Sequence, residues 1–133
     1  NVARFLTLPF AMIGSDGAPR GGRPHPRVYG TFPRVIRRFV RELRSLSLED
    51  AVRKMTAASA DRLGLADRGR SQVGRQADAV LFDPDTFSDT ATFEDPCRYP
   101  VGLAAVTVGG RLVVHGDRMT GERAGRFCRR GGR

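Results

Sequence analysis

The chain has 133 residues and a mass of 14.6 kDa, which suits one domain or a piece of one and excludes a complete (β/α)8 barrel of about 250 residues. A hydrophobic content of 40% and a charged content of 28% are typical of a folded globular protein. The formal net charge is +9, and no apolar run approaches the roughly 18 residues of a transmembrane helix, so we expect no membrane partner.

The positive charge has two explanations. It would attract nucleic acid or an anionic surface, or it reflects arginine-rich coding in a protein whose more acidic remainder is not in this sequence. We favour the second, because the arginines are dispersed rather than gathered in blocks, and we expect no nucleic-acid partner. Cys97 and Cys128 form no C-x-x-C pair, which favours a reducing compartment, and we expect a cytoplasmic protein.

In chain order, the first expected element is a short buried strand over residues 8–13. It stops at Gly14-Ser15-Asp16-Gly17, a polar turn flanked by glycines. Residues 17–30 are rich in glycine and proline and predict a loop. The sequence begins with Asn1 rather than Met, and we expect a fragment or a processed piece.

A helix is predicted to open at Thr31, with its hydroxyl as the N-cap and Pro33 in the first turn. Its apolar stripe has helical spacing and consists of Phe32, Val35, Ile36, Phe39, Val40 and Leu43. The opposite face carries five arginines, namely Arg34, Arg37, Arg38, Arg41 and Arg44. This face is either a solvated polar surface, the usual meaning of such a pattern, or a grip for phosphates.

Ser47 predicts a second helix start, and Gly64 is expected to end the helical region as a C-terminal glycine. The character of the sequence then changes. Strands are expected over residues 77–83, 103–108 and 111–115, the last two joined as a hairpin through Gly109-Gly110. We therefore expect α/β structure up to a boundary near residue 70 and β structure after it.

Asp16 is the strongest candidate for chemistry. A carboxylate at the end of a buried strand can bind a metal or act as a general base, although a turn aspartate that bonds its own backbone has the same local pattern. His25 lies between two prolines, beside Arg23 and Arg27, where it could contact an anionic substrate or simply form a packing corner. His115 is interpreted as structural or exposed.

Several segments resemble the D-aminoacylases, the N-acyl-D-amino-acid deacylases of the amidohydrolase superfamily. The segments that carry the resemblance are Met12 to Gly17, His25-Pro26-Arg27, Tyr29 to Arg34, Leu48 to Thr56, Ala60 to Leu65, Asp67 to Arg70, Gly74 to Pro84, Phe93 to Pro96 and Tyr99 to Gly102. The resemblance covers nearly the whole chain. The Gly-Ser-Asp-Gly and Gly-Thr-Phe-Pro-Arg elements narrow it from the superfamily to the D-aminoacylase branch.

The resemblance implies a zinc-dependent hydrolase of small N-acyl-D-amino acids, built as a metal-dependent (β/α)8 barrel joined to a small β-sandwich. Asp16 matches the family aspartate that activates zinc-bound water and protonates the leaving amine, and it is also a candidate metal ligand. His25 and Arg27 are the expected substrate-binding residues. The family's histidine ligands and its bridging cysteine are absent from this sequence, and Cys97 does not replace that cysteine.

We therefore expect the C-terminal fragment of such an enzyme, whose partner is the missing N-terminal part of the same protein. Residues 1–70 would hold the last barrel strand and the C-terminal helices, and residues 71–133 the C-terminal strands of the β-sandwich. Two alternatives are a small basic binding module that uses the arginine face and a fragment without independent function.

Overall fold

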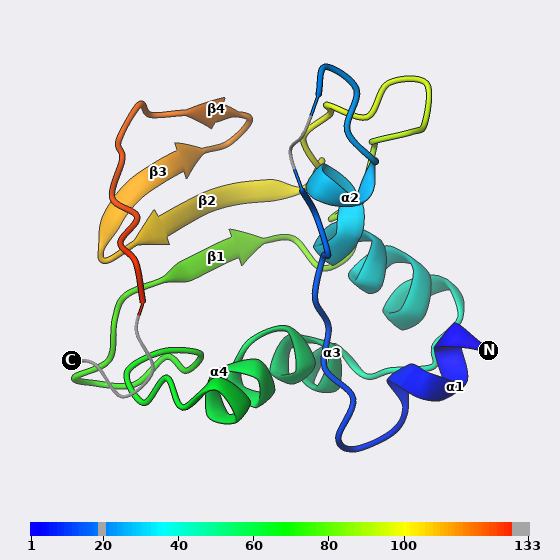
Figure 1. Ribbon diagram of the computed structural model, residues 1–133, viewed down its shortest axis with the longest axis horizontal. Helices are drawn as coiled ribbons and strands as arrows, with labels where there is room; N and C mark the ends of the chain where they lie inside the picture. The colour runs from blue at the N-terminus through cyan, green and yellow to red at the C-terminus, as the bar shows by residue number, and fades with distance from the viewer. Residues whose placement is uncertain (19–20, 129–133) are drawn as a thin grey trace.

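The computed structural model describes residues 1–18 and 21–128. Helices fill the first half of the chain and strands the second half. The elements are α1 (Val2–Leu6), α2 (Arg27–Arg34), the π-helix η1 (Val35–Glu42), α3 (Leu48–Met55), α4 (Ala57–Leu63), β1 (Ala79–Phe82), β2 (Leu103–Val108), β3 (Arg111–His115) and β4 (Arg118–Met119). Figure 1 shows the sheet above α3 and α4, with α2 and η1 to one side of it.

The four strands form one antiparallel sheet in the order β1-β2-β3-β4. The predicted hairpin is confirmed. Gly109 and Gly110 have φ angles of 57° and 79°, the pair of positive values that a tight primed turn requires. β4 was not expected from the sequence, and residues 129–133 of the predicted β region lie outside the described residues.

The predicted signals around α3 and α4 are also confirmed. The Ser47 side chain accepts a hydrogen bond of 3.1 Å from the Asp50 N–H, as an N-cap should. Gly64 ends α4 in the left-handed conformation with a φ of 71°. Local sequence signals therefore determine both ends of this helical pair.

The prediction that a helix opens at Thr31 is wrong. Helix α2 begins four residues earlier, at Arg27, and the Thr31 hydroxyl donates to the Arg27 carbonyl from inside the helix at 2.8 Å. Pro33 has no N–H to donate within α2, and from Val35 the helix widens into the π form of η1. The last turn of η1 shows this wider spacing, since the Leu43 N–H donates to the Arg38 carbonyl at 2.9 Å.

The strand predicted over residues 8–13 is also wrong. Residues 8–10 form a bend and a turn, and residues 11–18 have neither helix nor strand in the described chain. The only hydrogen bond of Ile13 to another element within the described ranges joins its N–H to the Lys54 carbonyl at 3.2 Å. A strand is defined by its ladder, and the described residues supply no neighbour for one here.

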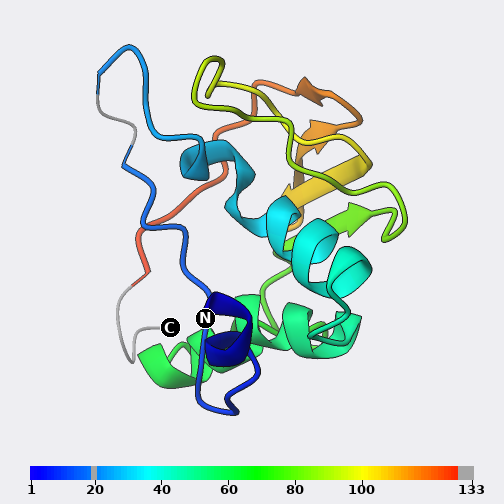
Figure 2. The ribbon, with the colours of Figure 1, turned by 90° about the vertical axis from the view of Figure 1, so that its right-hand side faces the viewer.

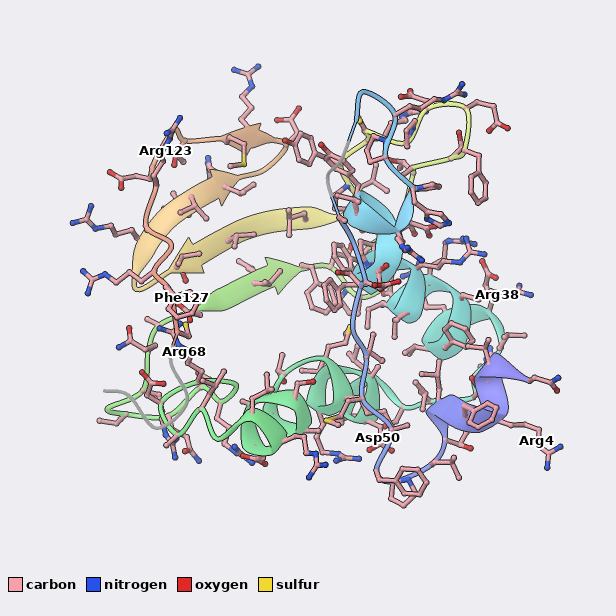
Figure 3. All side chains as sticks on the ribbon, in the orientation of Figure 1. Arg4, Arg38, Asp50, Arg68, Arg123 and Phe127 are labelled. Atoms are coloured by element: carbon pink, nitrogen blue, oxygen red, sulfur yellow. The ribbon has the colours of Figure 1, made fainter. Side chains whose placement is uncertain are left out.

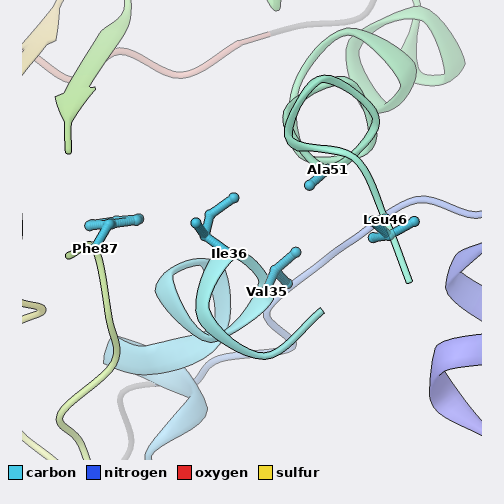
Figure 4. Packing of buried hydrophobic residues seen from close by; sticks show 5 residues of the cluster. All are labelled: Val35, Ile36, Leu46, Ala51 and Phe87. Atoms are coloured by element: carbon cyan, nitrogen blue, oxygen red, sulfur yellow. The ribbon is translucent and has the colours of Figure 1, made fainter. Parts of the chain in front are cut away.

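The core lies where η1, α3 and the segment after β1 meet. Its buried members are Val35, Ile36, Leu46, Ala51 and Phe87 (Figure 4). Phe82 packs beside Phe87 with ring centroids 4.7 Å apart, so the sheet is joined to the helices through aromatic contact. The boundary predicted near residue 70 stays a prediction.

Two arginines of the predicted arginine face, Arg37 and Arg41, make hydrogen bonds inside the molecule, whereas Arg34 and Arg38 are 59% and 46% exposed. Arg41 donates to the Pro84 and Phe87 carbonyls at 2.8 and 2.7 Å, and to the Ser88 hydroxyl at 2.5 Å. Arg37 donates to the Asp89 carboxylate, whose side chain is 7% exposed, at 2.7 Å. These arginines fasten the segment after β1 onto η1, and are not free to grip phosphates.

Other arginines lie far apart on the surface. Figure 3 shows Arg4 and Arg38 on one side of the molecule and Arg123 on the opposite side. Within the described residues, no helix has the length and apolar character needed to cross a bilayer.

Candidate active-site loop

The candidate site is the turn Gly14-Ser15-Asp16-Gly17 and the start of helix α2. Figures 1 and 2 show the segment over residues 11–18, in blue, running from the level of α3 toward α2. The Ser15 hydroxyl accepts the Gly17 N–H at 3.2 Å, which closes the turn on itself. A Cβ atom at Gly17 would lie 3.1 Å from the Cα atom of Val28, so glycine lets the turn approach the start of α2 closely.

Asp16 presents its carboxylate outward from this turn. Its backbone has a φ of 47°, in the left-handed region that aspartate tolerates better than most residues. Its side chain is 87% exposed. The carboxylate does not bond the backbone of its own turn in the described structure, which disfavours the interpretation of Asp16 as a simple turn residue.

The structure brings Asp16 and Arg27 together. An Arg27 guanidinium nitrogen lies 3.1 Å from a carboxylate oxygen of Asp16, and the Arg27 side chain is 45% exposed. An ion pair this exposed contributes at most about 1 kcal/mol, so a ligand carboxylate can take the place of Asp16 beside Arg27 at low cost. The pair therefore places an acidic and a basic group side by side and open to a ligand.

The His25 side chain holds the backbone of Arg27 in place. The His25 Nδ1 atom accepts the Arg27 N–H at 3.0 Å and so satisfies one of the free donors at the start of α2. The imidazole packs edge-on against Phe93, with centroids 5.0 Å apart. Arg23, in the same loop, donates to the Glu94 carbonyl at 2.8 Å. The loop before α2 is thus held by the segment that follows β1, a contact that the sequence did not reveal.

The described residues do not form a metal centre by themselves. No group of three or more histidine, cysteine, aspartate or glutamate side chains is gathered within residues 1–18 and 21–128. Cys97 and Cys128 are exposed and unpaired, and His115 is exposed at the end of β3. Because protein zinc sites use three or four ligands, the one carboxylate of Asp16 does not hold zinc alone.

Residues 1–114 match the model of the amidohydrolase family. The chain belongs to this family. It is 49% identical over 130 residues to the D-aminoacylase of Alcaligenes xylosoxydans xylosoxydans, a match that covers 98% of this chain and 27% of that protein. The resemblance to the D-aminoacylases is therefore confirmed for nearly the whole of this chain.

Solved structures agree with the sequence match. A D-aminoacylase crystal structure superposes with a TM-score of 0.92 at 48% identity, over 97% of this chain and 27% of the other. The N-acyl-D-glutamate deacylase of Bordetella bronchiseptica, complexed with zinc and a phosphonate inhibitor, superposes with a TM-score of 0.81 at 50% identity, over 84% of this chain and 24% of the other. This amidohydrolase chain thus spans about a quarter of the length of the relatives it matches.

Proposed function

We propose that this chain is the C-terminal part of a zinc-dependent amidohydrolase that cleaves the amide bond of N-acyl-D-amino acids. The observation that carries the proposal is the exposed Asp16 carboxylate beside Arg27, in a chain about half identical to proteins named for this activity. Water adds to the amide carbonyl, the C–N bond breaks, and the products are a carboxylate and a free D-amino acid.

Asp16 would move the proton in this reaction. Its carboxylate accepts a proton from the attacking water and then gives it to the leaving nitrogen, which would otherwise depart as an unstable amide anion. The exposure of the Asp16 carboxylate supports this assignment, because a substrate or a metal ion bound next to the turn could reach it. Asp16 is also the metal ligand that we propose for this chain, and the other zinc ligands would come from the rest of the protein.

Arg27 and His25 are proposed to bind the substrate. An N-acyl-amino acid carries a carboxylate, and a guanidinium binds carboxylates with two parallel hydrogen bonds. Arg27 already pairs with a carboxylate and is half-exposed. His25 acts on the substrate through Arg27, because its ring accepts the Arg27 N–H.

The partner of this chain is proposed to be the N-terminal part of the same protein. Large apolar side chains are exposed in α1 and the turn after it, and on the edge strand β1. Their exposed fractions are 67% for Phe5, 74% for Phe10, 55% for Val80 and 64% for Leu81. Exposed apolar surfaces of this kind mark places where another protein segment or a partner packs. We propose that residues 1–70 complete a (β/α)8 barrel and that residues 71–133 complete a β-sandwich.

A cytoplasmic location is proposed on the cysteines. Cys97 and Cys128 are unpaired in the described structure, which fits a reducing compartment.

A chimera tests the proposed function. This chain replaces the 130 residues that it matches in the D-aminoacylase of Alcaligenes xylosoxydans xylosoxydans, so that the remaining sequence is supplied by a relative. We expect the purified chimera to hold zinc and to release D-amino acids from N-acetyl-D-amino acids but not from the L-isomers. A chimera that melts cooperatively, binds zinc and hydrolyses neither isomer would contradict the proposal.

A further inference from the structure

Lys54 is a buried cation in a chain that otherwise uses arginine. It is the one lysine among 23 basic residues. Its side chain is 1% exposed, and with Ile36 it is among the largest fully buried side chains of the described chain. Burying a charge is costly unless its donors are used, so this position needs an explanation beyond packing.

The ammonium group of Lys54 donates to main-chain carbonyls. Its Nζ atom lies 2.6 Å from the Leu8 carbonyl oxygen and 3.2 Å from that of Ala11. The backbone carbonyl of Lys54 accepts the Ile13 N–H at 3.2 Å. Within the described ranges, no carboxylate pairs with Lys54. Both hydrogen bonds of its ammonium group reach one segment, residues 8–13, whereas its backbone carbonyl also accepts the Ser59 hydroxyl at 3.2 Å.

Residues 8–13 depend on these contacts, because they have neither helix nor strand in the described structure. Apart from the Leu8 N–H, which donates to the Phe5 carbonyl of α1 at 3.1 Å, their hydrogen bonds to other described elements are made with Lys54, and the Ile13 side chain packs against the core. Asp16 follows this segment directly, on a backbone turn with a φ of 47°. The place of the Asp16 carboxylate therefore depends on a segment that Lys54 of α3 ties to the helices with three hydrogen bonds.

We propose that Lys54 is a positioning residue, which fixes residues 8–13 and so holds the Asp16 carboxylate in its working place. The proposal rests on the proton-transfer role of Asp16. An ammonium suits the task, since it is a compact head whose donors turn to meet two carbonyls at once, whereas a guanidinium is a larger planar fork. This difference explains a lysine in an arginine-rich sequence.

The test compares Lys54→Met with Lys54→Arg in the chimera, with Arg53→Met as the matched control. Met keeps the length of the stem and removes every donor, and Arg53 is the neighbouring exposed residue, paired with Asp50. We expect Lys54→Met to lower kcat by about 10–100-fold, within the range for misplaced acid–base groups, with KM within about twofold. Lys54→Arg keeps the charge and the donors on a larger head that fits the two carbonyls less well, so it should lower kcat by about two- to fivefold, less than Lys54→Met. Arg53→Met should match the parent.

Hydrogen exchange supplies a readout separate from activity. Amides of residues 11–17 should exchange faster in Lys54→Met and not in Arg53→Met. A folded Lys54→Met protein with parental kcat, or one with low kcat and parental exchange in residues 11–17, would overturn the proposal. If Lys54→Met does not fold, Lys54→Arg provides the test. A more than tenfold loss of kcat in Lys54→Arg, with parental hydrogen exchange in residues 11–17, also overturns the proposal. Failure of the Asp16 role shows separately, as normal turnover in Asp16→Asn.

Discussion

Asp16 and Arg27 place opposite charges 3.1 Å apart on two different elements, a turn and the first residue of α2. Neither charge is buried, so the pair contributes little to the stability of the chain. The ion pair instead fixes the relative position of the two side chains. The pair keeps the proposed proton acceptor, Asp16, and the proposed carboxylate-binding cation, Arg27, next to each other at an open surface.

Replacing Asp16 with Asn in the chimera should abolish most turnover and leave the fold intact. The amide has nearly the same shape, but it cannot take a proton from water or pass it to the leaving nitrogen. Loss of a general acid–base group lowers rates by about 10²–10⁴. The measurement is kcat together with zinc content, and a fall in zinc affinity would mark Asp16 as a ligand too. Near-normal turnover would leave Asp16 as an ordinary loop residue.

Arg27→Met should raise KM for N-acyl-D-amino acids by roughly 10–100-fold, because a charged hydrogen bond to a carboxylate is worth about 1.5–3 kcal/mol. His25→Ala should be milder, because His25 holds only the Arg27 backbone N–H. Steady-state kinetics of both variants beside the parent chimera measure the difference. Equal effects of the two substitutions would argue against a direct substrate contact by Arg27.

The sequence predicted part of this site. The sequence singled out Asp16 as a candidate because a carboxylate in a glycine-flanked turn after an apolar run is a local pattern, and its role stays a prediction. The Asp16–Arg27 pair and the support of His25 by Phe93 could not be predicted from spacing, since they depend on how the loop before α2 folds back. The one signal for Lys54 was compositional, a lone lysine among arginines.

At the scale of elements, the segment after β1 is fastened to η1 by charge. Arg41 bonds two carbonyls and a hydroxyl there, and Asp89 receives Arg37 at 2.7 Å and Arg34 at 3.3 Å. Burial of the Asp89 carboxylate works to raise its pKa, but the hydrogen bond and charge of Arg37, with those of Arg34, outweigh it and hold the pKa below its ordinary value.

Asp89 should therefore contribute to stability in a pH-dependent way. A carboxyl whose pKa is lowered on folding stabilises the folded state above its ordinary pKa of about 3.9, and this contribution is lost as the pH falls through the folded value. Asp89→Asn in the chimera should lower the melting temperature at pH 7 and flatten its decline below about pH 4. Melting curves from pH 3 to 7 test this, and parallel curves for parent and variant would exclude the contribution.

The helices and strands show which signals in the sequence are sufficient to predict local structure. The hairpin, the Ser47 cap and the Gly64 end were predicted because each depends on residues close in sequence. The strand over residues 8–13 was wrong because a strand needs a partner, and local sequence does not show whether one is present. The predicted start at Thr31 was wrong because the helix already begins at Arg27, so Thr31 lies inside it and its hydroxyl donates to the Arg27 carbonyl instead of accepting a backbone N–H as a cap.

At the scale of the whole molecule, the chain has a small core and wide apolar surfaces. Seven apolar residues are buried among the described ones, whereas Phe5, Phe10 and Leu81 are each more than 60% exposed. This balance is expected for a piece whose covering lies elsewhere.

The isolated chain should accordingly unfold without a sharp transition, bind a dye that reports apolar surface, and hold no stoichiometric zinc. Calorimetry, dye fluorescence and metal analysis of the chain beside the chimera make the comparison. A soluble monomer with a cooperative melt, or one zinc per chain with measurable deacylation, would contradict this expectation.

The burial of the single lysine also gives the chain a built-in chemical reporter. An amine-directed acylating reagent finds one side-chain target in this sequence, the Nζ atom of Lys54, and that atom belongs to a buried side chain. In the folded chimera, the peptide that contains Lys54 should stay unmodified until the segment over residues 8–13 lifts away. The rate of its acylation, followed by mass spectrometry, therefore measures how often that segment opens.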